Sequence, residues 1–351
     1  MSLIILTSAH RLRSVYRLQR IHGHMMTSQA GSEVLFEKVG NAGVVTLNRP
    51  RALNLTMIRH IYPQLKKWDK YSETDIVIIK GAGGKAFCAG GDIRAVKDAG
   101  KAGDSLAQDF FHEEYILNNT TGTYQKPYVA LIDGITIIIC NDVGGGHFLP
   151  GFQGKLGLFL VLTGFRLKGR DVQRVRVATH FVHSEKTASL EKNLVHLKSH
   201  SISDVAQQLD SYQEQGSLDA EKPFVLQQHT EAIDRLFSAA SVEEIVENLK
   251  KDGSAFAQKQ TQTLAKMSPT SLKLTFRQIQ EGAKMSLQEV LVMEYRLSQA
   301  CMRGQDFYEG VRAVLINKDQ SPKWKPSTLS EVSEQTVEEC FSSLGERDLK
   351  L

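Results

Sequence analysis

The sequence predicts an α/β fold with a parallel sheet at its core, followed by a largely helical C-terminal region. Between residues 34 and 80, strand-forming segments, an amphipathic helix and a fully apolar strand follow one another, which is the order of a βαβ unit. A second apolar strand is expected at Tyr128–Ile132. After residue 180 the apolar residues recur at helical spacing instead.

The first elements can be placed individually. Two short strands, Val34–Lys38 and Gly43–Leu47, are joined by residues 40–42, which are Gly-Asn-Ala and suit a turn. From Thr56 to Tyr71 the apolar spacing is that of a helix. Asp75–Lys80 is β-branched and apolar, which is typical of a strand buried on both faces.

The C-terminal half contains two helix-start signals. Ser241 with Glu244, and Ser286 with Glu289, each have the spacing of a capping box. Residues 190–222 are rich in Ser, His, Gln and Asp with weak periodicity, so a mobile connector is expected there. The predicted division is a leader at 1–32, a core domain at 33–185, a connector at 186–222 and a helical region at 223–351.

The net charge of +4 resides at the N-terminus. Residues 1–32 contain Arg11, Arg13, Arg17 and Arg20 but no lysine and no acid, so the remainder has 39 basic and 39 acidic residues. An arginine-rich, acid-free, amphipathic N-terminus is typical of a mitochondrial transit peptide, although a frayed terminus with chance charge is the alternative. A neutral body lacks the basic excess that nucleic-acid binding requires, so such partners are not expected.

The sequence argues against a membrane-spanning helix and against a structural site built from cysteines. The longest apolar segment, residues 129–140, is interrupted by Asp133 and Gly134 and is shorter than the ~20 residues of a membrane-spanning helix. The four cysteines are widely separated and form no C-x-x-C pair, so neither a zinc site nor a disulfide scaffold is expected.

A glycine-dense segment, residues 81–93, follows the strand predicted at 75–80. Its start superficially matches a dinucleotide fingerprint, but Gly90 and Gly91 would interrupt the helix that such a site needs. Ala86 stands where a phosphate-binding loop of the Walker type has Ser or Thr. The preferred interpretation is a loop whose backbone N–H groups face a ligand and stabilise a developing oxyanion.

Several motifs resemble those of one enzyme family. They are Asn48-Arg49-Pro50 with Ala52-Leu53-Asn54, residues 85–93 (KAFCAGGDI), residues 126–134 (KPYVALIDG), residues 142–146 (DVGGG), residues 162–164 (LTG), residues 178–182 (ATHFV), residues 267–271 (MSPTS) and residues 293–297 (MEYRL). From about Glu33 to the C-terminus the chain resembles the crotonase superfamily of acyl-CoA enzymes, and within it the 3-hydroxyisobutyryl-CoA hydrolases.

This resemblance implies a crotonase-like spiral core and hydrolysis of an acyl-CoA thioester in valine breakdown in the mitochondrial matrix, with no cofactor beyond the CoA of the substrate. A homo-oligomer is possible. The implied site residues are Ala89, whose N–H is the first oxyanion donor, Gly91 and Asp92 in the CoA-facing loop, and Glu114 and Asp142 as substrate-contacting or catalytic carboxylates. The alternatives are an exposed helix charge for Glu114 and an N-cap for Asp142.

The pattern breaks after Thr136. The family pattern continues with a Gly-Gly-Gly helix start that supplies the second oxyanion N–H, then a core strand, then a Pro-Glu-Thr segment with the principal catalytic glutamate. Here only Ile137-Ile138-Ile139-Cys140-Asn141 separates Thr136 from Asp142. A parallel crossover needs at least ~10–12 residues, so one core strand and its helix are missing.

Two consequences are expected from this loss. A sheet edge and apolar faces should be left without partners, and residues 135–140 have the composition of an aggregation-prone segment. Hydrolysis should be impaired, and the alternative is a catalytically inactive variant that binds CoA or a partner, or that does not fold stably.

Overall fold

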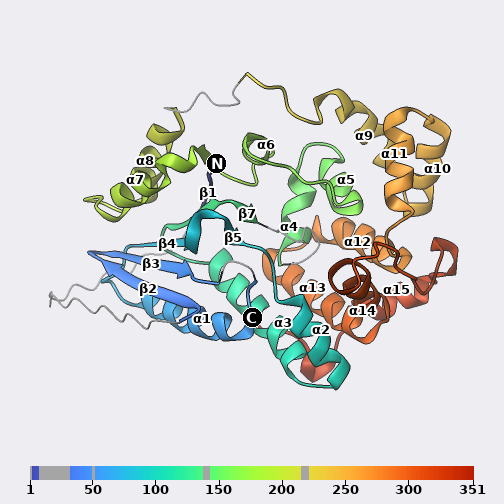
Figure 1. Ribbon diagram of the computed structural model, residues 1–351, viewed down its shortest axis with the longest axis horizontal. Helices are drawn as coiled ribbons and strands as arrows, with labels where there is room; N and C mark the ends of the chain where they lie inside the picture. Colours follow the sequence, from blue (N-terminus) through green and yellow to red (C-terminus); the bar gives the residue numbers. More distant parts are fainter. Residues whose placement is uncertain (1, 8–31, 50–51, 137–142, 215–220) are drawn as a thin grey trace. The chain divides into compact units, whose positions relative to one another are not determined.

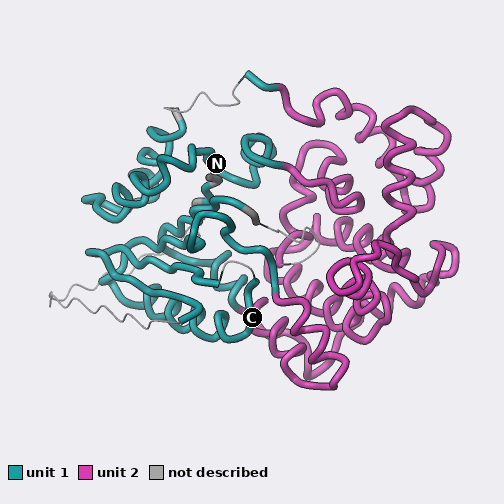
Figure 2. The backbone as a smooth tube through the Cα atoms, viewed as in Figure 1, with its two compact units in different colours: residues 1–91, 117–137, 168–222 teal, residues 92–116, 138–167, 223–351 magenta. Residues whose placement is uncertain are grey.

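The computed structural model describes residues 2–7, 32–49, 52–136, 143–214 and 221–351. These residues form two compact units (Figure 2). Unit 1 comprises residues 1–91, 117–137 and 168–222, and unit 2 comprises residues 92–116, 138–167 and 223–351. The division therefore differs from the predicted boundary at 185, because two earlier segments group with the C-terminal helices.

Unit 1 is built on a six-stranded sheet in the order β2-β3-β4-β6-β1-β8 (Figure 1). Its strands are β1 Ser2–Thr7, β2 Val34–Val39, β3 Ala42–Leu47, β4 Ile76–Gly81, β6 Tyr128–Asp133 and β8 His180–Val182. β2 and β3 form an antiparallel hairpin, and β3, β4 and β6 pair in parallel. The predicted α/β core with parallel strands is confirmed.

The first βαβ unit forms where the apolar pattern predicts it. Helix α1, Leu55–Lys70, begins after Asn54, whose side-chain oxygen accepts a hydrogen bond from the Met57 N–H. The helix connects β3 to β4, and Trp68 packs so closely on Gly43 of β3 that a Cβ there would lie 2.8 Å from the indole ring. The helix therefore docks tightly on the start of β3.

The sheet edge that the missing strand would have covered is occupied. β1 pairs antiparallel with β6 along all six of its residues, from Ser2 opposite Asp133 to Thr7 opposite Tyr128. On its other side, β1 pairs antiparallel with β8. The expectation of an exposed edge at β6 is wrong, because residues assigned to the leader supply a strand that reaches this edge without a crossover from β6.

The expected mobile connector is also wrong. Residues 190–222 contain most of α7, Ser184–Val195, and all of α8, Ile202–Glu214. Their buried side chains join one hydrophobic cluster with sheet residues, including Val44, Ile78 and Leu131. The helix residues of this cluster recur at helical spacing: Leu190, Leu194, Val205, Leu209 and Tyr212. This sparse apolar stripe is sufficient to dock two otherwise polar helices on the sheet.

Unit 2 is helical within the described residues. Its helices of at least six residues are α2 Ile93–Ala102, the first part of α3 Leu106–Gly122, α5 Leu156–Thr163, α9 Thr230–Phe237, α10 Val242–Asp252, α11 Ala255–Leu264, α12 Pro269–Gly282, α13 Leu287–Arg303, α14 Asp306–Val311 and α15 Glu334–Phe341. Both predicted helix starts are confirmed. Ser286 and Glu289 form a complete capping box, whereas Ser241 caps α10 and Glu244 accepts instead from the Ala240 N–H.

The core of unit 2 surrounds α5. Phe159 has no exposed surface and packs edge-on against Phe237 of α9, with ring centroids 5.3 Å apart. Outside α5, helices α9 to α12 contribute the buried side chains of this cluster together with Leu149 and Leu226. A helix that is apolar on every side, as α5 is, belongs in an interior, and these four helices surround it with apolar partners.

Several sequence predictions concern other parts of the chain. Residues 8–31, with the four arginines of the predicted leader, and residues 137–142 lie outside the described residues. Cys88, Cys301 and Cys340 form no disulfide, while Cys140 falls in the second of these segments. No helix among the described residues is both long and apolar enough to cross a membrane.

Stability is expected to depend on the protonation of His180 at the start of β8. Its Nδ1 lies 2.8 Å from Thr179 Oγ1 and its Nε2 lies 3.1 Å from Asp210 Oδ1. Burial lowers the pKa of His180, and Asp210 opposes that effect. His180 therefore binds a proton more readily in the unfolded chain than in the folded protein. The stability that neutral His180 contributes is complete above about pH 6.5 and is lost as pH falls toward its lower folded pKa.

Urea unfolding of the wild type and of His180→Gln between pH 8 and pH 5 measures this contribution. We expect the wild type to lose more stability than the variant as pH falls from 7 to 5. Equal pH dependence in the two proteins would show that His180 does not titrate as described.

Candidate functional site

The predicted oxyanion loop lies in unit 1 after β4. The chain forms a short 3₁₀ turn, η1 Ala82–Gly84, and then β5, Ala86–Cys88, which pairs in parallel with β7, Ile135–Thr136. Ala89 follows β5 directly and is partly exposed. The predicted first donor thus belongs to a loop that backbone pairing holds at its start.

The end of this loop is held by residue Leu53. The Leu53 N–H donates to the Gly90 carbonyl at 2.8 Å, and Leu53 forms an isolated parallel bridge with Gly91. Gly90 has a φ of 91°, a backbone angle that residues with a Cβ rarely adopt. Gly90 therefore allows the turn, and the Ala52-Leu53-Asn54 motif has a physical role as the neighbour that fixes it.

Asp92 acts as a helix cap. Its Oδ1 accepts a hydrogen bond from the Ala95 N–H at 3.3 Å, which makes it the N-cap of α2. A carboxylate at this position interacts favourably with the first turn of the helix. The loop that begins at β4 therefore ends at α2, and Asp92 has a structural role besides the predicted contact with CoA.

Glu114 lies in the part of α3 that belongs to unit 2. It is 8% exposed, so the alternative that it is a solvated helix charge is wrong. The next residue, Tyr115, is fully buried and packs edge-on against Tyr295 of α13, with ring centroids 6.1 Å apart. A carboxylate is rarely buried unless a partner or a function compensates for its desolvation, which is consistent with the predicted role.

The glycines that follow Asp142 are held by a buried carboxylate. Glu294 of α13 is 1% exposed and accepts hydrogen bonds from the N–H of Gly144 at 2.6 Å and of Gly146 at 2.8 Å. Gln278 Nε2 donates a third at 2.8 Å. A Cβ on Gly282 would lie 2.1 Å from the Gly146 carbonyl oxygen, so only glycine fits there. This segment continues as α4, Gly145–Phe148.

Sequence reasoning did not identify Glu294 as part of this arrangement. Its position carried a signal, because Val290, Leu291 and Leu297 lie three or four residues away on the apolar face of the same helix. A charged residue within an apolar face needs a buried partner. The partner could not be inferred, because all residues except proline have a backbone N–H and the sequence does not indicate which of them is the donor.

The predicted site residues come from both units of the structure. Ala89 and Gly91 belong to unit 1, and Asp92 and Glu114 to unit 2. Asp142 lies outside the described residues, so its predicted role stays a prediction. Residues 137–142 contain no glutamate, and neither does the segment from Val143 to Thr163. No group of three metal-ligating side chains occurs in the part of the chain that the structure describes.

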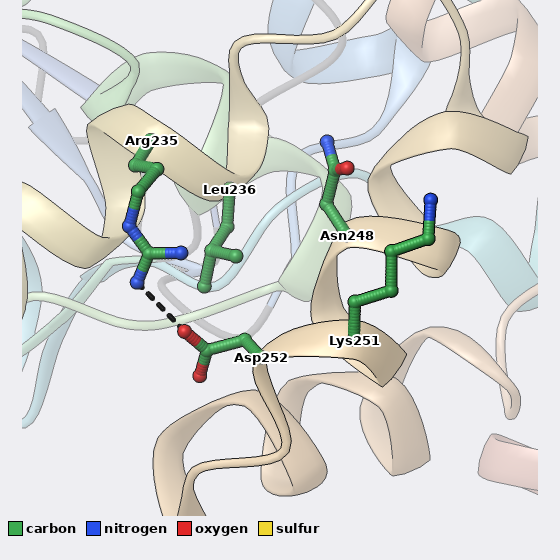
Figure 3. A pocket seen from close by; sticks show the side chains of 5 residues that line it. All are labelled: Arg235, Leu236, Asn248, Lys251 and Asp252. Carbon is green, nitrogen blue, oxygen red and sulfur yellow. Dashed lines mark hydrogen bonds and ion pairs between the residues drawn. The ribbon is translucent and has the colours of Figure 1, made fainter.

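An open surface hollow lies elsewhere in unit 2 (Figure 3). It has a volume of about 270 Å³ and is lined by Arg235, Leu236, Asn248, Lys251 and Asp252. Arg235 and Asp252 pair across it at 2.7 Å. None of the predicted site residues lines it, and its one carboxylate, that of Asp252, is already paired with Arg235. We therefore do not assign the chemistry to this hollow.

Each unit contains one of the predicted groups for acyl transfer. The predicted oxyanion donor, Ala89, lies in unit 1 in the loop that ends at Gly91, and Glu114 in unit 2 is a carboxylate held away from solvent. A second backbone donor and a second acid/base would be needed to complete a hydrolytic site. In the family pattern both come from the segment that this chain lacks.

The chain is similar to known proteins on both sides of the break after Thr136. The enoyl-CoA hydratase/isomerase family model matches residues 42–137 and 136–341 as two segments, which meet where the sequence pattern breaks. The mitochondrial 3-hydroxyisobutyryl-CoA hydrolase of Danio rerio is 77% identical, with 100% of each chain covered. That alignment has 382 positions for the 351 residues of this chain, so 31 positions have no residue here. The human enzyme of the same name is 55% identical, with 97% of each chain covered.

Solved structures agree on the fold. A carnitinyl-CoA dehydratase from Mycobacterium thermoresistibile has a TM-score of 0.81 at 29% identity, covering 91% of this chain and 99% of its own. An enoyl-CoA hydratase from Rhodobacter sphaeroides 2.4.1 has a TM-score of 0.78 at 30% identity, covering 91% and 100%.

Glu294→Gln is expected to destabilise the protein by about 2 kcal/mol or more. The amide would place an NH₂ group or a weaker acceptor against buried N–H donors that now share a carboxylate. Urea unfolding measures the loss. Glu346→Gln, at an exposed residue, is the matched control and should change stability by less than about 0.5 kcal/mol. Equal effects of the two substitutions would contradict the assignment of Glu294.

Proposed function

Because the chain belongs to the enoyl-CoA hydratase/isomerase family, we propose that it is a 3-hydroxyisobutyryl-CoA hydrolase with strongly reduced turnover. The observation that carries this proposal is identity of 77% to a hydrolase of that name along the whole of both chains. The reaction converts 3-hydroxyisobutyryl-CoA and water to 3-hydroxyisobutyrate and CoA. The names of the relatives support a mitochondrial location.

Each predicted residue has a role in this reaction. The Ala89 N–H donates to the thioester oxygen as water adds to the carbonyl carbon, while Gly91 and Asp92 keep the loop in its turn and line the path of CoA. Glu114 contacts the substrate and can accept a proton from the attacking water, with Asp142 as the second carboxylate. The thiolate of CoA then leaves and takes up a proton.

The missing segment is the reason for the reduced rate. Loss of one oxyanion donor typically costs ~10²–10³ in rate. Loss of the principal acid/base costs a further ~10²–10⁴. The remaining donor and Glu114 supply only part of the transition-state stabilisation, so we propose turnover at least ~10⁴ below that of an intact relative.

Steady-state hydrolysis of 3-hydroxyisobutyryl-CoA by the purified chain tests the proposal, with the Danio rerio relative as reference. The variant Glu114→Gln should abolish the residual turnover. Glu113→Gln is the matched control, because it makes the same change at the adjacent residue and should leave the turnover within about twofold. Turnover within tenfold of the relative would refute the reduced rate.

A second candidate function is favoured by the missing catalytic glutamate. The chain would then bind acyl-CoA, or another subunit of its family, without hydrolysing it. Saturable CoA binding together with no turnover above the buffer background in the wild type, as in Glu114→Gln, would favour this candidate over slow hydrolysis. We propose no nucleic-acid or membrane partner for either candidate, and a homo-oligomer for both.

The proposed chemistry uses water and protein groups alone, so it needs no cofactor beyond the CoA of the substrate. Dialysis against EDTA should leave the residual hydrolysis rate unchanged within experimental error. A rate that falls on chelation and returns with one added divalent cation would contradict this part of the proposal.

A further inference from the structure

The N-terminal strand β1 has a position that the hydrolase chemistry does not explain. It lies inside the six-stranded sheet, between β6 and β8, rather than at an edge. Its sequence, SLIILT, is uncharged and rich in apolar residues, whereas the arginines of the predicted leader begin at Arg11. The N-terminal region thus contains two segments of different character.

We propose that residues 2–7 replace the core strand that the chain lacks, and that they therefore remain in the folded protein instead of being discarded with a leader. The missing strand would have followed β7 and returned beside β6. β1 now pairs with that side of β6 along its full length and joins it to β8. The replacement runs antiparallel to β6, so it satisfies the same backbone groups without a crossover.

Residue Ile4 anchors this strand. Its side chain has no exposed surface and belongs to the cluster that contains Val129, Val182 and the apolar residues of α7 and α8. Its carbonyl oxygen accepts two hydrogen bonds from Thr179, one from the N–H at 2.9 Å and one from Oγ1 at 2.8 Å. Ile4 thus connects β6, β8 and the helices that cover them.

The length of the chain permits this arrangement. β1 and β2 are four positions apart in the sheet, which corresponds to about 19 Å at the usual strand spacing. Residues 8–31 can reach about 80 Å when fully extended. A connection of this length is therefore sufficient to join β1 to β2, and cleavage within it would not by itself remove β1 from the sheet.

Hydrogen–deuterium exchange on the full-length chain tests the replacement. In Ile4→Asp a carboxylate would replace the buried side chain, so β1 should leave the sheet and the amides of β6 should exchange at least about tenfold faster than in the wild type. Leu12→Asp is the matched control, because it places the same charge in the N-terminal region outside the strand and should leave this exchange unchanged.

The milder variant Ile4→Ala covers the case in which Ile4→Asp does not fold. It should accelerate exchange in β6 and β8 more than in α10, which lies in the other unit. Equal exchange in the wild type and both Ile4 variants would overturn the proposal, as would equal acceleration by Ile4→Asp and Leu12→Asp.

Native mass spectrometry of the protein recovered from mitochondria tests retention. The proposal predicts a mass that includes residues 2–7, either joined to the chain or as a bound peptide. A folded protein that contains neither would overturn it.

Discussion

The backbone of β6 imposes the constraint on which the rest of unit 1 depends. A central strand that is buried on both faces cannot leave one row of N–H and C=O groups without partners, because each unsatisfied group costs about 1–3 kcal/mol. Removal of the next strand along the chain creates this situation. In the structure β1 pairs with β6, and the hydrophobic cluster beneath α7 and α8 is then continuous from Val44 through Leu131 and Ile4 to Val182.

Strand pairing and catalysis place different requirements on the sequence. Strand pairing is largely a matter of backbone groups, so a short apolar segment from another part of the chain can provide it in either direction. Catalysis needs particular side chains at particular positions, and the sequence between Thr136 and Asp142 contains neither a glutamate nor the Gly-Gly-Gly helix start of the family pattern. On the proposal of reduced turnover, the protein keeps the architecture of its family while it loses most of the rate.

The local elements were largely predictable from the sequence. The hairpin, α1, the buried strands and the two capped helices each follow from apolar spacing and cap residues within a short window. The pairing of Ser2–Thr7 with β6 was not predictable, because composition marked the whole N-terminal segment as a leader. The helices at Ser184–Val195 and Ile202–Glu214 were missed because their polar residues concealed a narrow apolar stripe.

The candidate site was predictable to a smaller extent. The glycine-dense segment indicated the loop that ends at Asp92, and the family resemblance indicated the acid at Glu114. The structure added that Asp92 caps a helix and that Glu114 is buried. Glu294 became visible only through its hydrogen bonds to Gly144 and Gly146. A hydrogen bond from a side chain to a backbone group that is distant in the sequence cannot be inferred from the pattern of a single sequence.

The strand pairing of β6 with β1 implies that the chain retains a cooperative, CoA-binding fold despite the missing segment. Thermal unfolding of the purified full-length chain, followed by far-UV circular dichroism with and without CoA, measures this property. We expect a single cooperative transition whose midpoint CoA raises, corresponding to about 2.7 kcal/mol at a hundredfold excess over the dissociation constant. A broad transition without cooperativity that CoA does not shift would contradict it.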